Sequence, residues 1–178
     1  MRKYLVQFKP FLIFIGTFFA AYIILTVVYK FYLNSLRPDE VDAVTNWVGH
    51  NVEQLLLMFN YDIKVQQGFA SPWLEVWFNN KYGVRIVEGC NAVSVIILFI
   101  SFVLAFSGKL KVTLLYILFG IVFIYILNVA RIALLTVLLF HYPEKSHLLH
   151  GVLFPLIIYG SVFILWVFWV NKFSKYAK

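Results

Sequence analysis

Long apolar blocks alternate with short polar segments along the chain. Their positions predict four membrane-spanning helices, at about residues 11–31, 91–107, 112–133 and 150–171. A helix needs roughly 20 apolar residues to cross a hydrocarbon core about 30 Å thick, and the second block reaches that length only when it begins near residue 90. We therefore expect an all-α membrane protein: a single integral-membrane domain over residues 1–178, built on a bundle of about four transmembrane helices.

Residues 34–89 form the main polar stretch and are predicted to be an outer loop. Within it, apolar residues recur at three- and four-residue spacing from Val41 to Phe59, which predicts an amphipathic helix in the membrane interface. Further on, Leu74–Phe78 and Val84–Glu88 have strand-forming sequences and flank Asn79–Gly83, which is rich in turn-forming residues. We expect a small outer-face amphipathic helix and a β-hairpin whose second strand leads directly into the second apolar block.

The composition agrees with a membrane location. Hydrophobic residues make up 62% of the chain and charged residues 13%. A soluble domain is about half apolar and about one quarter charged. The apolar blocks are therefore not explained by the core of a soluble protein.

The distribution of charge predicts the orientation. The two terminal segments and the loop at 107–111 contain no acidic residue and eight basic ones: Arg2, Lys3, Lys9, Lys109, Lys111, Lys172, Lys175 and Lys178. All eight Asp and Glu residues fall in the segments on the other side. Short loops rich in Lys and Arg stay in the cytoplasm, so both termini are expected there and residues 34–89 outside. The net charge of +7 follows largely from this asymmetry, which favours membrane lipid and not nucleic acid as a partner.

The single cysteine, Cys90, lies immediately before the second predicted span, in the segment Glu88-Gly-Cys-Asn91-Ala. Asn91 is a favourable N-cap, and the positive end of the helix that it opens favours the thiolate form of Cys90. The free amides of that helix end can also hold an oxyanion, whereas Glu88 opposes thiolate formation. A free cysteine is equally well explained as a small apolar residue, and both interpretations stay open.

Arg131 interrupts a long apolar stretch, residues 112–140. An arginine at mid-bilayer costs at least about 2.5 kcal/mol. Twenty residues of helix counted from Lys111 cover about 30 Å, which brings Arg131 to the outer boundary at the level of Cys90. Asn128, three residues earlier, lies on the same helix face. The alternative is an arginine that extends from a helix end to the interface.

Three of the four histidines lie in or beside the short segment before the fourth predicted span: His141, His147 and His150. The spacing of His147 and His150 places both on one face of a helix. Taken alone, each can be an ordinary interface residue. However, a thiol, a guanidinium and an imidazole at the outer ends of three different spans are the groups that acyl transfer through a thioester requires.

Residues 88–160 resemble the exosortase/archaeosortase family of integral-membrane cysteine transpeptidases. The matching motifs, in order, are Glu88-Gly-Cys90-Asn-Ala, Asn128-Val-Ala-Arg131-Ile and a histidine just ahead of the last span. The end of the chain, from Ile158 to Val170, is similar to that of the short, F-type exosortases. The chain has fewer spans than the larger members of the family.

The resemblance implies a role for each motif. Cys90 would be the nucleophile, Arg131 would stabilise the thiolate or the tetrahedral oxyanion, and a histidine would act as general acid or base. His150 is favoured, because with Phe154 it resembles a His-x-x-x-Phe pattern of short members, and His147 is the alternative. Three other motif residues are candidates for supporting roles: Glu88, Asn91 and Asn128.

The resemblance also implies a substrate class. Substrates in this family are exported proteins with a C-terminal tail made of a recognition motif, a membrane helix and a basic cluster. The tail is cut at the outer, periplasmic face of the bacterial inner membrane, and the new end is either released or joined to a surface acceptor amine. No cofactor and no metal ion are expected.

Other functions are compatible with parts of the pattern. A non-catalytic membrane scaffold or transporter subunit would also contain a buried arginine and scattered histidines, without needing Cys90. A haem-binding bundle is disfavoured because bis-histidine ligation needs facing histidines, and here three lie in one segment. A zinc protease of the His-Glu-x-x-His type is disfavoured because that spacing is absent.

Overall fold

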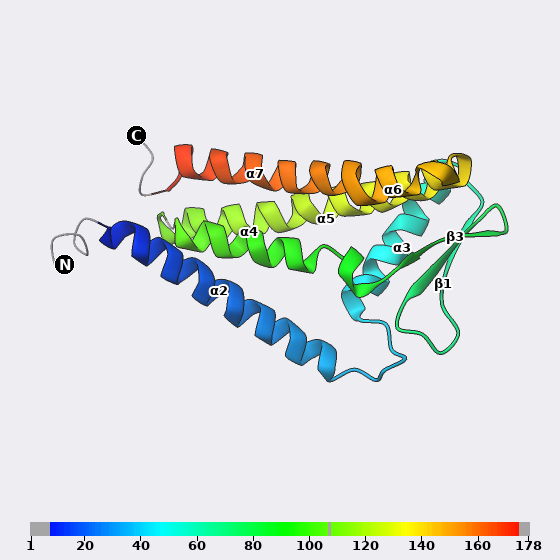
Figure 1. Ribbon diagram of the computed structural model, residues 1–178, viewed down its shortest axis with the longest axis horizontal. Helices are drawn as coiled ribbons and strands as arrows, with labels where there is room; N and C mark the ends of the chain where they lie inside the picture. Colours follow the sequence, from blue (N-terminus) through cyan, green and yellow to red (C-terminus); the bar gives the residue numbers. More distant parts are fainter. Residues whose placement is uncertain (1–7, 107, 175–178) are drawn as a thin grey trace.

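The computed structural model describes residues 8–106 and 108–174 (Figure 1). The longer helices are α2 (Lys9–Asn34), α3 (Ala43–Met58), α4 (Val93–Ala105), α5 (Leu110–His141) and α7 (Phe154–Lys172). The short helical turns are η1 (Glu88–Cys90), η2 (Pro143–Lys145), α6 (Ser146–Leu148) and the π-helical η3 (Leu149–Leu153). A small antiparallel sheet consists of β1 (Ile63–Gln67), β2 (Leu74–Phe78) and β3 (Lys81–Ile86). The prediction of a mostly helical chain is confirmed.

Three of the described helical segments are long and apolar enough to cross a membrane: Lys9–Asn34, Leu110–His141 and Pro143–Lys172. Several such helices are typical of a multi-pass membrane protein. The predicted span at 91–107 is instead a helix of 13 residues, α4, which at 1.5 Å per residue is about 20 Å long. It begins late because Ala92 has a left-handed backbone, with φ of 64°, which cannot continue a right-handed helix.

The helices lie side by side, with the start of α2 and the end of α7 at one end of the molecule and α3 and the sheet at the other (Figure 1). At the end that holds the start of α2, the helices α4, α5 and α7 enclose a core. This core includes Phe99, Tyr116 and Trp169. Helix α2 packs on α4, where the ring of Phe14 lies 4.4 Å from that of Phe106, yet none of its side chains is buried. Helix α2 therefore presents most of its apolar surface outward, as expected of a helix that faces lipid.

The sheet differs from the predicted hairpin in its number of strands and in its turn. Strand β2 lies between β1 and β3, so a third strand is present. The turn uses two residues, Asn79 and Asn80, which both have left-handed backbones with φ of 47° and 59°, as a type I′ turn requires. Strand β3 therefore begins at Lys81 and not at Val84. Gly83 is an extra residue that forms a β-bulge opposite β2.

Helix α3 follows the predicted apolar spacing, but its apolar face meets protein. Asp42 caps the helix, and its Oδ1 accepts hydrogen bonds from the N–H groups of Val44 and Thr45, both at 3.0 Å. The buried side chains Val48, Val52 and Leu56 pack in one cluster with the sheet and α5. The apolar face of α3 is therefore covered by α5 and the sheet, and the location of the helix in the membrane interface stays a prediction.

Helix α5 is longer than the predicted span 112–133. Beyond Arg131, it carries Ile132 and Ala133 into the cluster shared by α3 and the sheet, and the ring of Phe140 lies 4.9 Å from that of Phe78. The apolar residues after Arg131 therefore support the sheet. Because of this contact, the sheet is held directly beside the part of α5 that carries Arg131.

Candidate functional site

A cavity of about 280 Å³ lies where β3, the η1 turn, α5 and the segment leading into α7 meet. Its walls include three of the predicted site residues, Cys90, Arg131 and His150. The other lining residues are Tyr82, Gly83, Val84, Arg85, Ile86, Ile132, Leu135, Leu139 and Ser146. The fold thus brings together a thiol, a guanidinium and an imidazole that are far apart in the sequence.

Cys90 is the last residue of the η1 turn and is partly buried. Its backbone carbonyl accepts a hydrogen bond of 2.8 Å from Nδ2 of Asn128, a residue of α5 that is fully buried. The prediction that Asn91 is the N-cap of α4 is displaced by one residue: Ala92 occupies that position, and Oδ1 of Asn91 accepts the N–H of Val93 at 3.0 Å. Cys90 therefore lies just before the helix and is positioned by a buried side chain of another helix.

Arg131 contributes an unpaired cation to the cavity. Its Nη1 donates a long hydrogen bond of 3.4 Å to Oδ1 of Asn128. Its Nε is buried and has no hydrogen-bond partner in the described part of the chain, where the one ion pair joins Arg37 to Glu40. A partly buried guanidinium without a counter-charge attracts an anion strongly, because the protein provides little other compensation. An anionic group in the cavity would be stabilised there.

The two candidate histidines are placed differently. His150 lies in the η3 turn and lines the cavity with Cys90. Both histidines are exposed, but His147, on α6, is not part of the cavity wall. The geometry therefore favours His150, the residue that the motif pattern also favours.

Asn91 and Glu88 are not among the residues that line the cavity. The Nδ2 group of Asn91 lies within hydrogen-bond distance of Tyr29 Oη at 2.9 Å, Thr45 Oγ1 at 3.2 Å and Asp42 Oδ1 at 3.4 Å. This buried cluster ties α2, α3 and the start of α4 together. Glu88 is exposed and lines a separate polar hollow with Asp42, so it does not share the cavity with Cys90.

Two groups of cavity residues could not be identified from the sequence. Five consecutive residues of β3, Tyr82 to Ile86, form one wall, and Ser146 of α6 forms part of another. The hairpin was expected next to Cys90, but its orientation depends on contacts with α3 and α5 that no local pattern reveals. A hydroxyl such as that of Ser146 is too common in loops to be noticed.

Comparison with protein-family models, with curated proteins and with solved structures gives no match to this chain. Within the described residues, no three His, Cys, Asp or Glu side chains are grouped so that they could hold a metal ion. The resemblance to the exosortases stays a prediction.

Proposed function

We propose that the chain is a membrane-embedded cysteine peptidase or transpeptidase of the exosortase type, which cleaves C-terminal sorting tails of exported proteins through a thioester on Cys90. One observation carries the proposal: Cys90, Arg131 and His150, from three different elements, line a single cavity. These are the groups that nucleophilic acyl transfer needs, a nucleophile, a stabiliser of negative charge and a proton carrier.

The first half of the reaction forms the thioester. The proton of Cys90 passes to the imidazole of His150, and the thiolate attacks the carbonyl carbon of the scissile peptide bond. The N–H groups of Arg131 stabilise the negative oxygen of the tetrahedral intermediate, and the buried Nε without a partner is available for this. The C–N bond then breaks, and His150 returns its proton to the leaving amine.

The second half regenerates the enzyme. Water or an acceptor amine attacks the thioester carbonyl and gives its proton to His150. The C–S bond breaks, which restores the thiolate and releases a free carboxylate or a new amide. Neither step requires a cofactor, since proton transfer and charge stabilisation come from the side chains.

The proposed orientation places the cavity on the outer face of the bacterial inner membrane, with both termini in the cytoplasm. The start of α2 and the end of α7 lie at the end of the molecule opposite the sheet, which supports this orientation (Figure 1). The basic residues Lys9, Lys109 and Lys172 lie in segments expected at the cytoplasmic end. In this arrangement α4 is the fourth, short span, and η1 lies at its outer end.

The decisive experiment compares the C-termini of surface proteins, by mass spectrometry, in cells that contain the wild-type chain or Cys90→Ala. The proposal predicts that trimmed C-termini disappear in the variant and that precursors with intact tails accumulate in the membrane. Identical C-termini in both strains, with the variant protein present at a normal level, would instead favour a non-catalytic scaffold or transporter subunit.

A further inference from the structure

Among the residues that the structure describes, strand β3 is an edge strand with no partner on its second side. The strand order is β1-β2-β3, so β2 is its one neighbour in the sheet. In the described ranges, no backbone hydrogen bond joins β3 to any element other than β2. An unpaired row of N–H and C=O groups is a template on which another strand can form.

This free edge faces the cavity. Residues 82 to 86 line it consecutively. Successive side chains of a strand point to opposite faces, so a cavity that touched one face would be lined by alternate residues. An uninterrupted run of lining residues means that the cavity meets the strand edge-on, at its backbone.

The pairing pattern identifies which backbone groups are unpaired. The N–H of Val65 in β1 donates to Oε1 of Glu53 at 2.8 Å, so it does not bond to β2. Because bonded and non-bonded pairs alternate in antiparallel sheets, Glu75 and Trp77 bond to β1, whereas Val76 bonds to β3. The residues of β3 opposite Glu75 and Trp77 are Arg85 and Tyr82. Their N–H and C=O groups therefore point toward the cavity.

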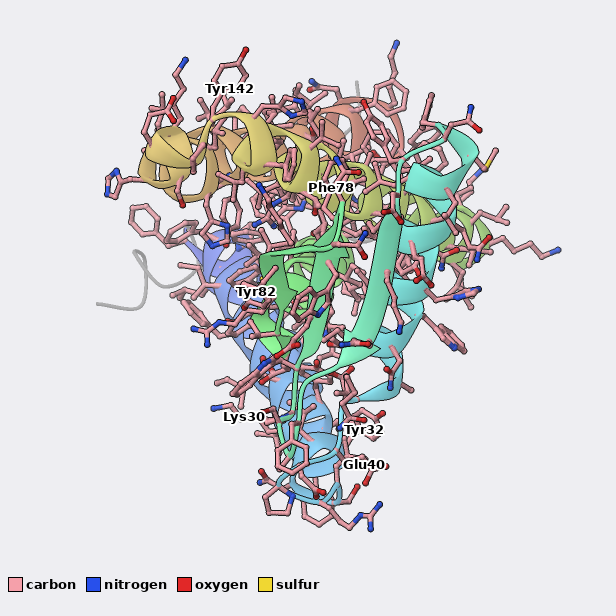
Figure 2. All side chains as sticks on the ribbon, turned by 90° about the vertical axis from the view of Figure 1, so that its right-hand side faces the viewer. Lys30, Tyr32, Glu40, Phe78, Tyr82 and Tyr142 are labelled. Atoms are coloured by element: carbon pink, nitrogen blue, oxygen red, sulfur yellow. The ribbon has the colours of Figure 1, made fainter. Side chains whose placement is uncertain are left out.

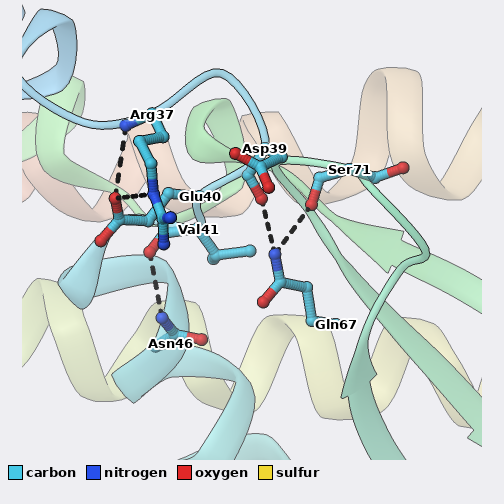
Figure 3. A network of polar contacts seen from close by, with 7 residues as sticks. All are labelled: Arg37, Asp39, Glu40, Val41, Asn46, Gln67 and Ser71. Carbon is cyan, nitrogen blue, oxygen red and sulfur yellow. Dashed lines mark hydrogen bonds and ion pairs between the residues drawn. The ribbon is translucent and has the colours of Figure 1, made fainter.

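The opposite edge of the sheet is covered by protein. Figure 2 shows β1 next to α3 and β3 on the side away from that helix. Besides the bond from Val65 to Glu53, Nε2 of Gln67 donates to the carbonyls of Asp39 and Ser71, at 2.6 and 3.2 Å (Figure 3). The contrast shows that the lack of cover on β3 is specific to the edge beside Cys90.

We propose that β3 binds an extended peptide segment as a fourth strand, in the cavity between β3 and α5, with a peptide carbonyl beside Cys90. The chain leads from the end of β3 at Ile86 through one residue into the η1 turn, so a strand added along β3 leads to the thiol. Leu135 and Leu139 of α5 form the facing wall and favour apolar side chains at alternate peptide positions. The identity of this peptide as a substrate rests on the proposed function, but its binding does not.

The test uses the purified full chain in detergent and two peptide chloromethyl ketones, which alkylate cysteine. Both have the sequence acetyl-Val-Ala-Val-Ala, and each carries one N-methyl group, on the second or the third amide. In an added strand, neighbouring amides point to opposite sides, so N-methylation blocks pairing in one isomer alone. The measured quantity is the second-order rate of Cys90 alkylation, relative to that of chloroacetamide, which has no peptide to bind.

We expect one isomer to react at about the rate of the unmethylated peptide and the other about 10-fold more slowly, as for the loss of about one hydrogen bond. Equal rates for the two isomers would overturn the proposal. Equal rates together with a dimeric mass in detergent would assign the free edge to a second copy of the chain.

A pair of variants tests the same contact from the protein side. Arg85→Pro removes the N–H that points to the cavity and no bond to β2, a substitution that edge strands tolerate. Arg85→Ala is the matched control, since it removes the side chain and keeps the N–H. Relative to the chloroacetamide rate of the same variant, we expect about a 10-fold slower peptide reaction for Arg85→Pro and a much smaller change for Arg85→Ala. Equal slowing in both variants would contradict strand addition. If Arg85→Pro does not fold, the two methylated peptides decide the question on the wild-type chain.

The outcome is separate from that of the processing experiment. Loss of trimmed C-termini in Cys90→Ala cells, with equal rates for the two isomers, would support the peptidase function and contradict the binding of a peptide as a fourth strand. Unequal rates with normal C-termini would leave a peptide-binding cavity that does not process these proteins.

Discussion

The two edges of the sheet have the same backbone chemistry but different surroundings. Along β1, the N–H of Val65 is bonded to Glu53 and the side chain of Gln67 binds two backbone carbonyls of neighbouring loops. Along β3, the backbone borders a cavity that also contains Cys90 and Arg131. Proteins usually cover or charge their sheet edges because an open edge pairs with other chains. Here the covered edge serves stability, and the open edge coincides with the reactive groups.

The largest effect is expected from the proposed topology, in which both edges of the sheet would lie on the outer face of the membrane. A membrane-impermeant maleimide should label Cys90 in intact spheroplasts. It should also label a cysteine near the β1 edge, Gln66→Cys in a Cys90→Ala background, because Gln66 is exposed. Lys109→Cys in that background, at the opposite end of the bundle, should react only after the cells are broken. The measurement is the mass shift of the purified chain. Labelling of Cys90 only in broken cells would overturn the orientation.

The second-largest effect tests whether the proposed reaction depends on Arg131, which lines the cavity beside β3. Arg131→Lys keeps the charge but replaces the planar fork of the guanidinium by a point charge. We expect activity, measured as the fraction of trimmed C-termini and the rate of their appearance, to fall by about 100-fold, as for loss of one oxyanion donor.

Arg37→Lys is the matched control, because Arg37 is an exposed arginine near the β1 side that pairs with Glu40. It should change the rate by less than about twofold, since exposed ion pairs contribute about 1 kcal/mol or less. Near-normal turnover in Arg131→Lys would contradict the role assigned to that residue.

A smaller effect is expected from the buried side chain that holds the Cys90 turn. Asn128→Ala removes the hydrogen bond to the Cys90 carbonyl and leaves that group without its partner. We expect the free energy of unfolding to decrease by roughly 1–3 kcal/mol. Thermal unfolding in detergent measures the loss, and the exposed Asn171→Ala is the control. If the two variants unfold alike, Asn128 does not hold the turn.

The smallest effect concerns the covered edge itself. Glu53→Ala removes the acceptor of the Val65 N–H, which should cost about 1 kcal/mol. Hydrogen exchange followed by mass spectrometry should show faster exchange in β1 of the variant, approaching the exchange of β3 in the wild-type chain. Exchange in β3 should be unaffected. Slow exchange of the Tyr82 and Arg85 amides in the wild-type chain would show that the β3 edge is covered after all.

Several features of the fold could be predicted because they depend on local sequence. The long apolar helices follow from the length of the apolar blocks, and α3 follows from apolar residues at helical spacing and the capping residue Asp42. Strand β1 was harder to predict, because one of its five residues is buried and three are polar. The late start of α4 could not be predicted either, since a left-handed alanine has no sequence signature.

For the site, the sequence supplied the candidate residues Cys90 and Arg131 and a preference for His150 over His147. It did not reveal that Asn128 binds the carbonyl of Cys90, which lies 38 positions away in the chain. It placed Asn91 and Glu88 with Cys90 because they are neighbours in sequence. In the structure, neither side chain lines the cavity: Asn91 contacts Tyr29, and Glu88 lines a separate hollow.

The sequence by itself determined the apolar helices, their charge asymmetry and the presence of one thiol, one arginine within an apolar stretch and a histidine-rich segment, because length, hydropathy and charge are properties of short stretches. The tertiary structure alone decided that β3 is left unpaired beside Cys90, while α3 covers β1. That arrangement depends on how α5 extends beyond Arg131 to pack against the sheet, through contacts such as Phe78 with Phe140. Contacts between residues far apart in the chain depend on the shape of the assembled core, which no short stretch encodes.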